Sequence, residues 1–177
     1  MCPVYFKPSS IENLAETMAE VASGAPDLPF WYYHFPAKTG VDFNMYEFVK
    51  HVDVAGNMPN FMGIKFTNEI IMDFNAMGNY KNKKYNMLMG RDEILTSALI
   101  TDVCDGGVGS TINYMSFNVD IDCEWNKTPK DMAKIIDLQL KTVMVIEKWS
   151  EVVPALNVQK SILKMTGIDF GPMRLPQ

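Results

Sequence analysis

The chain has 177 residues, of which 47% are hydrophobic and 21% are charged, and its formal net charge is −5 at pH 7. These fractions are close to the averages of globular domains, and they exclude a disordered tail, a collagen-like repeat and a low-complexity linker. An acidic chain without a Lys/Arg cluster argues against nucleic acid or an anionic membrane as the main partner. At this length one compact domain over residues 1–177, with a buried core, is expected.

The cysteines and the amino-terminal residues indicate the compartment. Cys2, Cys104 and Cys123 are widely spaced and form no CxxC pair, so neither a disulfide framework nor a zinc site is expected. The first residues lack the basic segment and the long apolar segment of a secretory signal. No run approaches the roughly 18 apolar residues that span a bilayer. We therefore expect a cytoplasmic protein with reduced cysteines and no bound metal.

Short apolar runs alternate with helical patterns along the chain. The runs expected to form strands are Pro3–Phe6, Leu28–Tyr33, Phe61–Phe66, Tyr85–Met89 and a run that ends in Gly107–Thr111. The helical patterns cover residues 11–21, behind a capping box of Ser9 and Glu12, and residues 42–52, 69–74, 92–100, 129–149 and 158–165. Strands that alternate with helices predict an α/β fold with parallel strands and crossover helices. This pattern does not separate a doubly wound sheet from a barrel.

Lys65 ends an apolar stretch of an expected strand. Ligands of parallel α/β folds bind at the carboxyl ends of the strands. Burial of an amine disfavours its charged form, and a neutral amine attacks carbonyl groups and forms Schiff bases. From spacing alone, a lysine with a packed stem and a solvated head is the more frequent interpretation.

Other polar groups follow the same expected strand ends. Tyr33 is a candidate proton shuttle, although an aromatic core residue with a satisfied hydroxyl is more frequent. Asp92 and Glu93 fit either a binding role or the first turn of a helix, where acidic groups are favoured. His34 and His51 show no metal-ligand spacing and are interpreted as structural or surface residues.

Four ordered motifs carry a resemblance to a known family. Tyr33–Val41 is similar to the loop Y-(N/H)-x-P-x-x-(S/T)-G-V of the class I pyruvate aldolases, the family of N-acetylneuraminate lyases and dihydrodipicolinate synthases. Gly63–Lys65 resembles the G-x-K strand of that family. Gly90–Glu93 and Gly107–Asn113 resemble the sugar-binding segments G-x-D-E and G-x-G-S-T-x-N of its N-acetylneuraminate lyase branch, and Gly171–Pro176 is similar to the family's ending.

The resemblance implies a fold and an activity. The fold would be a (β/α)8 barrel, of which this chain carries about strands four to eight and a helical carboxyl-terminal extension at about residues 129–177. The activity would be a lyase that cleaves N-acetylneuraminate to N-acetylmannosamine and pyruvate through a Schiff base, with no metal or diffusible cofactor, in a homotetramer. Lys65 would attack the keto carbon and Tyr33 would relay the proton of the substrate hydroxyl. The residues that would hold the sugar chain are Thr67, Gly90, Asp92, Glu93 and Ser110.

The sequence also departs from the family pattern. No segment matches the G-(S/T)-T-G-E loop that grips the pyruvate carboxylate, and Arg91 lies between two expected binding residues without an assigned role. One alternative is therefore an inactive partial barrel that associates with full-length subunits. Another is a related pyruvate-dependent aldolase such as a dihydrodipicolinate synthase, although Ser110–Asn113 favours the sialic acid branch.

Overall fold

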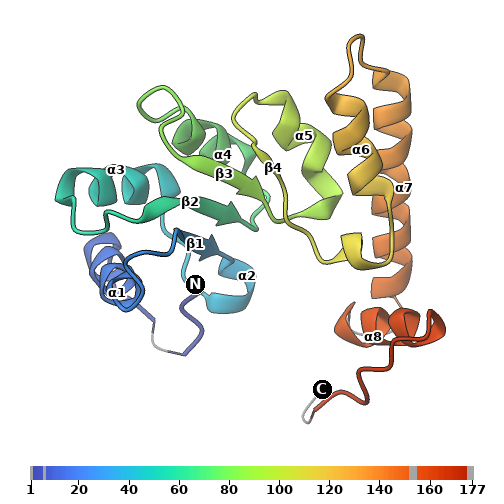
Figure 1. Ribbon diagram of the computed structural model, residues 1–177, viewed down its shortest axis with the longest axis horizontal. Helices are drawn as coiled ribbons and strands as arrows, with labels where there is room; N and C mark the ends of the chain where they lie inside the picture. The colour runs from blue at the N-terminus through green and yellow to red at the C-terminus, as the bar shows by residue number, and fades with distance from the viewer. Residues whose placement is uncertain (1, 6, 152–154, 175–177) are drawn as a thin grey trace. The chain divides into compact units, whose positions relative to one another are not determined.

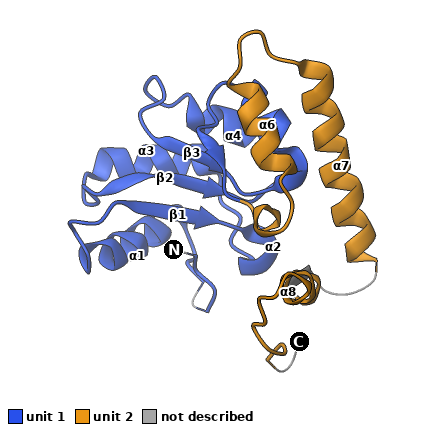
Figure 2. Cartoon of the chain, turned by 45° about the vertical axis from the view of Figure 1, so that its right-hand side comes forward, with its two compact units in different colours: residues 1–108 blue, residues 109–177 orange. Residues whose placement is uncertain are grey.

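The computed structural model describes residues 2–5, 7–151 and 155–174. The chain divides into two compact units, residues 1–108 and residues 109–177 (Figure 2). A single domain with a helical extension at about residues 129–177 stays a prediction.

A parallel sheet forms the centre of the first unit (Figure 1). Among the described residues its four strands follow the order β1-β2-β3-β4 and span Phe30–His34, Phe61–Phe66, Asn86–Met89 and Gly106–Gly107. Every neighbouring pair is parallel, and at least one helix separates consecutive strands in the chain, as crossover connections require. The predicted α/β class with parallel strands is confirmed.

Helices connect the strands of this unit. They are α1 (Ile11–Ser23), α2 (Pro36–Thr39), α3 (Met45–Ala55), α4 (Ile71–Gly78) and α5 (Leu95–Ile100), with a 3-10 turn η1 (Asp92–Ile94) before α5. Local chemistry sets the ends of α3: the side chain of Asn44 accepts a hydrogen bond from the N–H of Glu47, and Gly56 closes the helix with a φ of +63°.

The core of the unit lies between the sheet and helices α3 and α4. The ring of Tyr32 packs 5.0 Å from that of Phe48 in α3, and Phe66 packs 5.5 Å from Phe74 in α4, measured between ring centroids. Burial of each such side chain contributes about 2 kcal/mol. Because side chains alternate between the two faces of a strand, Tyr33 and Lys65 occupy the opposite, less buried face.

The start of the chain differs from the prediction. The run expected as a strand at Pro3–Phe6 forms no strand over Pro3–Tyr5, and Phe6 lies outside the described residues. Val4 and Tyr5 are 54% and 90% exposed, so their side chains are not packed against a sheet. Pro3 also lacks the N–H that a sheet ladder uses. The described sheet therefore begins at β1.

The cap of α1 is displaced by one residue from the prediction. The Oγ of Ser10, not of Ser9, accepts the hydrogen bond from the N–H of Asn13, at 3.2 Å. The side chain of Asn13 accepts in turn from the N–H of Ser9, at 3.3 Å. Asn13 thus takes the reciprocal part that the predicted capping box gave to Glu12, because Ser10 has the extended backbone that precedes a helix.

The second unit is helical over its described residues. It contains the 3-10 turn η2 (Thr111–Asn113), α6 (Phe117–Trp125), α7 (Met132–Ser150) and α8 (Ala155–Met165). Helices α6 and α7 are joined by a hydrogen bond from Thr142 to Asn118 and by Glu124, which pairs with Lys134 at 2.9 Å. The long helix predicted from Pro129 begins at Met132 instead, where the side chain of Asp131 caps it.

Helix α6 was not predicted. Its apolar residues Phe117, Val119 and Ile121 alternate with polar ones, and this period of two is typical of a strand. Only Ile121 of the three is fully buried.

Within the described residues, no helix is long and apolar enough to cross a membrane.

Candidate functional site

Lys65 and Tyr33 are neighbours on the sheet. They are register partners in the parallel pair of β1 and β2, and both side chains are partly exposed on the face opposite the aromatic core. The Nζ of Lys65 lies 4.2 Å from the centroid of the Tyr33 ring. An amine and a phenol are therefore held together at the carboxyl ends of two adjacent strands, the edge where parallel α/β folds bind ligands.

Thr67 and Gly90 adjoin this pair. A Cβ atom on Gly90 would lie 1.9 Å from the Oγ1 of Thr67 and 3.0 Å from the Cε of Lys65. The absence of a side chain at Gly90 therefore lets Thr67 and the Lys65 stem pack directly against its backbone. Thr67 is 5% exposed, and its Oγ1 is buried with no hydrogen-bond partner among the described residues. A buried hydroxyl without a partner is costly, and a bound ligand could supply the missing bond.

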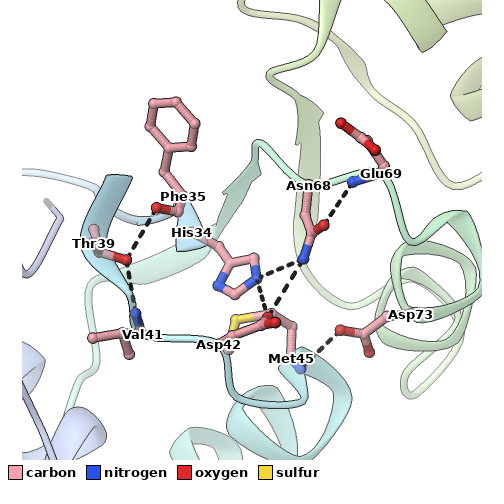
Figure 3. A network of polar contacts seen from close by, with 9 residues as sticks. All are labelled: His34, Phe35, Thr39, Val41, Asp42, Met45, Asn68, Glu69 and Asp73. Carbon is pink, nitrogen blue, oxygen red and sulfur yellow. Dashed lines mark hydrogen bonds and ion pairs between the residues drawn. The ribbon is translucent and has the colours of Figure 1, made fainter. Parts of the chain in front are cut away.

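The segment that follows Tyr33 is a compact turn (Figure 3). Pro36 begins the short helix α2, where its missing N–H does no harm, and Gly40 ends it with a φ of +67°. The buried hydroxyl of Thr39 donates to the carbonyl of Phe35 at 3.0 Å and accepts from the N–H of Val41 at 3.1 Å. The Pro, Thr and Gly of the motif thus build the turn that leaves Tyr33 at the strand end.

His34 is fully buried on the side of the sheet that faces the core. Figure 3 shows its ring beside Asn68 and Asp42, with Nε2 lying 3.5 Å from the Asn68 amide nitrogen and 3.8 Å from the Asp42 carboxylate. Burial lowers the pKa of His34 to about 4, and nearby Asp42 offsets this only in part. The ring is therefore neutral at pH 7. Its contacts tie the segment after β1 to the segment after β2, which agrees with a structural role.

Asp92 and Glu93 form the turn η1 directly after β3. Asp92 is 7% exposed, and Glu93 is partly exposed. Arg91 caps this turn and places its guanidinium 3.5 Å from the Glu93 carboxylate. The carboxyl end of β3 thus carries two acidic side chains next to Gly90.

Ser110 lies in the second unit, at the residue before η2. It is exposed, and its carbonyl accepts a hydrogen bond from the Asn113 side chain at 3.2 Å. Six of the seven predicted site residues, all except Ser110, are therefore in the first unit. Lys65, Tyr33, Thr67 and Gly90 lie close together there, and Asp92 and Glu93 follow Gly90 in the chain.

A side-chain contact that was not predicted from the sequence lies on the same face of the sheet as Lys65. The Nε1 of Trp31 donates to the Asn86 side chain at 3.0 Å, so a hydrogen bond links β1 to β3 across β2. Gly63 is the β2 residue between them, and a Cβ on it would lie 1.8 Å from the Asn86 carbonyl oxygen. Trp31 and Tyr33 are two residues apart in β1, so their side chains lie on the same face of the sheet. This spacing is the sequence signal that places the Trp31–Asn86 hydrogen bond on the face of Tyr33 and Lys65.

The chain is similar to known proteins along its whole length. The whole chain, residues 1–177, matches the dihydrodipicolinate synthetase family. N-acetylneuraminate lyase A of Xenopus laevis is 36% identical over 182 residues, which cover 99% of this chain and 56% of the relative. N-acetylneuraminate lyase of Mus musculus is 33% identical over 178 residues, which cover 99% of this chain and 54% of the relative. The chain thus spans about half the length of these relatives.

Solved structures agree with the sequence matches. The N-acetylneuraminate lyase of Proteus mirabilis matches with a TM-score of 0.87 at 27% identity, over 99% of this chain and 57% of that one. The N-acetylneuraminate lyase of Aliivibrio salmonicida matches with a TM-score of 0.87 at 30% identity, over 98% of this chain and 56% of that one. The chain therefore belongs to the dihydrodipicolinate synthetase family, and its parallel α/β fold corresponds to part of the aldolase barrel.

Proposed function

We propose that this protein is a Schiff-base lyase that cleaves N-acetylneuraminate to N-acetylmannosamine and pyruvate. The observation that carries the proposal is the position of the Lys65 amine, 4.2 Å from the centre of the Tyr33 ring at the carboxyl edge of the sheet. Family membership supports the aldolase chemistry, and the relatives at 33–36% identity that are named N-acetylneuraminate lyase support the substrate.

The chemistry needs an amine and a proton relay. In its neutral form the Lys65 amine attacks the keto carbon, and loss of water gives a protonated imine. The imine accepts the electron pair of the adjacent carbon–carbon bond when that bond breaks, while the Tyr33 hydroxyl relays the proton of the neighbouring substrate hydroxyl, accepting it and passing its own on, so that a proton is available for the enamine carbon. The aldehyde product leaves, a proton adds to the enamine carbon, and hydrolysis of the imine releases pyruvate and restores Lys65.

The remaining residues would position the substrate. Gly90 lets Thr67 and Lys65 approach its backbone closely, and the unpartnered Oγ1 of Thr67 points to a hydrogen bond with the ligand. The carboxylates of Asp92 and Glu93 suit the hydroxyl groups of a sugar chain, because an ionised carboxylate accepts several hydrogen bonds. We assign the same role to Ser110 from its motif. By the same resemblance we propose a homotetramer with no metal or diffusible cofactor.

A second candidate is an inactive chain that associates with full-length subunits. The observation in its favour is that no segment of this sequence matches the loop that grips the pyruvate carboxylate in the family. A third is a lyase for another 2-keto acid, because the lysine–tyrosine pair by itself recognises no particular sugar.

The deciding experiment is a turnover assay with the purified chain. Pyruvate release from N-acetylneuraminate is followed with lactate dehydrogenase and NADH, for the parent, for Lys65→Arg and for Tyr33→Phe. We expect turnover in the parent, its loss in Lys65→Arg, and a fall of at least about 100-fold in Tyr33→Phe. Release from other 2-keto-3-deoxy sugar acids alone would favour the third candidate. Absence of turnover with every substrate, in a folded chain, would favour the second.

A further inference from the structure

The guanidinium of Arg91 lies between two carboxylates at the carboxyl edge of the sheet. Its Nη2 lies 2.5 Å from Oε1 of Glu69, and its Nη1 lies 3.5 Å from Oε1 of Glu93. The third nitrogen, Nε, is buried and has no hydrogen-bond partner among the described residues. The guanidinium is therefore fixed along one edge by Glu69 and Glu93 while its inner nitrogen is shielded from water.

The two carboxylates come from different loops. Glu69 follows Thr67 in the segment after β2, and Glu93 belongs to η1 after β3. Arg91 thus ties together the loops that carry Thr67 on one side and Gly90 on the other. A planar guanidinium suits this task better than an ammonium does, because its nitrogens offer several donors in a fixed plane.

Further contacts hold the segment of Glu69, one of the two carboxylate partners of Arg91. The N–H of Glu69 donates to the side chain of Asn68 at 2.7 Å, and the amide of Asn68 lies 3.5 Å from both His34 and Asp42 (Figure 3). Since His34 is fully buried, the series of contacts is attached to the core of the unit. The Glu69 backbone is therefore attached to the core on the β2 side, while its side chain, 71% exposed, makes the contact with Arg91.

The contact with Arg91 restrains the side chain of Glu93. Its side chain is 30% exposed, and a glutamate at that exposure samples several rotamers unless a partner restrains it. We propose that Arg91 is a positioning residue for the sugar portion of the substrate, acting by holding the Glu93 carboxylate toward the ligand. This inference rests on the proposed function, and it assigns Arg91 no contact with the carbon that reacts with Lys65.

The test separates the two parts of the substrate. Pyruvate contains only the portion that reacts with Lys65, whereas N-acetylneuraminate contains the sugar chain as well. The purified chain is incubated with increasing concentrations of each ligand and sodium borohydride, and intact mass spectrometry gives the half-saturating concentration for covalent trapping. The variants are Arg91→Gln, Arg91→Lys and, as a control, Lys50→Gln, which removes a lysine of an exposed pair on α3.

We expect Arg91→Gln to raise the half-saturating concentration of N-acetylneuraminate about tenfold, since one charged hydrogen bond is at stake, and to leave that of pyruvate unchanged. Arg91→Lys keeps the charge and should recover part of the loss, and Lys50→Gln should match the parent. Unchanged pyruvate trapping also shows that Arg91→Gln is folded.

Two results would overturn the inference alone. One is equal half-saturation by N-acetylneuraminate in the parent and in Arg91→Gln. The other is an equal loss of trapping with both ligands, which would make Arg91 a purely structural residue. A parent chain that pyruvate does not modify would instead refute the proposed function, and the inference would fall with it.

Discussion

Acidification should destabilise this protein through one buried histidine. His34 is fully buried, its ring stacks 5.2 Å from Phe66, and burial lowers its pKa from 6.5 to about 4. In the unfolded chain the same ring titrates near its ordinary pKa. The unfolded state therefore binds a proton between pH 6.5 and pH 4 that the folded state does not bind, and stability falls as the pH falls through this window.

The size of the effect follows from the two pKa values. At pH 8 the ring is neutral in both states, and the pH dependence from His34 vanishes. At pH 5 the unfolded ring is almost fully protonated while the folded ring is almost fully neutral. Each pKa unit corresponds to about 1.4 kcal/mol, so the loss from His34 at pH 5, relative to pH 8, is about 2 kcal/mol.

The assay compares the parent with His34→Asn, since asparagine does not titrate and resembles the amide of the related motif. Urea unfolding of both proteins is followed by far-ultraviolet circular dichroism at pH 8, 6.5, 5.5 and 5. His34→Asn should be less stable at pH 8 because the stacked ring is lost, but the gap should narrow by about 2 kcal/mol at pH 5. Other acidic groups titrate equally in both proteins. Parallel stability curves over this range would refute the reasoning.

Three further substitutions follow from close contacts. Gly63→Ala should lower the free energy of unfolding by about 3 kcal/mol, because its Cβ would lie 1.8 Å from the Asn86 carbonyl oxygen; urea unfolding measures this. Gly90→Ala should reduce the rate of pyruvate trapping at least about tenfold, because its Cβ would meet Thr67 beside the reactive amine. Asp53→Asn should lower the urea midpoint, because hydrogen bonds from neighbouring lysines and tyrosines hold the pKa of this carboxyl well below its usual range.

Matched controls exist for the two substitutions that are read by urea unfolding, Gly63→Ala and Asp53→Asn. Gly24→Ala places its Cβ 3.4 Å from the nearest non-adjacent atom, in a right-handed backbone conformation, and should leave stability nearly unchanged. Asp137→Asn removes a carboxylate from an exposed pair with Lys141 and should shift the urea midpoint much less than Asp53→Asn. If either control lowers the stability as much as the substitution with which it is compared, the contact named for that substitution is not the cause of the loss.

Much of the fold was predictable because its signals are local. The apolar run Phe61–Phe66 carries a lysine at its last but one position, and the structure places the run as β2 with Lys65 at the carboxyl edge. The Pro, Thr and Gly after Tyr33 specify a turn by their own chemistry, and that turn forms. Local residue patterns show that helices alternate with strands along the chain, and this alternation predicted the parallel pairing of the strands.

What escaped prediction depends on contacts distant in the chain or on ambiguous periods. Helix α6 carries a strand-like alternation, and only its packing against α7 through Asn118 and Thr142 decides its state. The bond from Trp31 to Asn86 joins residues 55 positions apart, which no local pattern shows. Arg91 had no assigned role in the sequence because its partner Glu69 lies 22 positions away, after a different strand.

The most direct test of the account is the site of covalent trapping. The chain is incubated with pyruvate and sodium borohydride, digested, and its peptides are sequenced by tandem mass spectrometry. The account predicts a reduced pyruvate adduct, N-carboxyethyl-lysine, on Lys65 alone among the lysines, and none in Lys65→Arg. An adduct spread over exposed lysines, or an unmodified Lys65 in a folded chain, would contradict it.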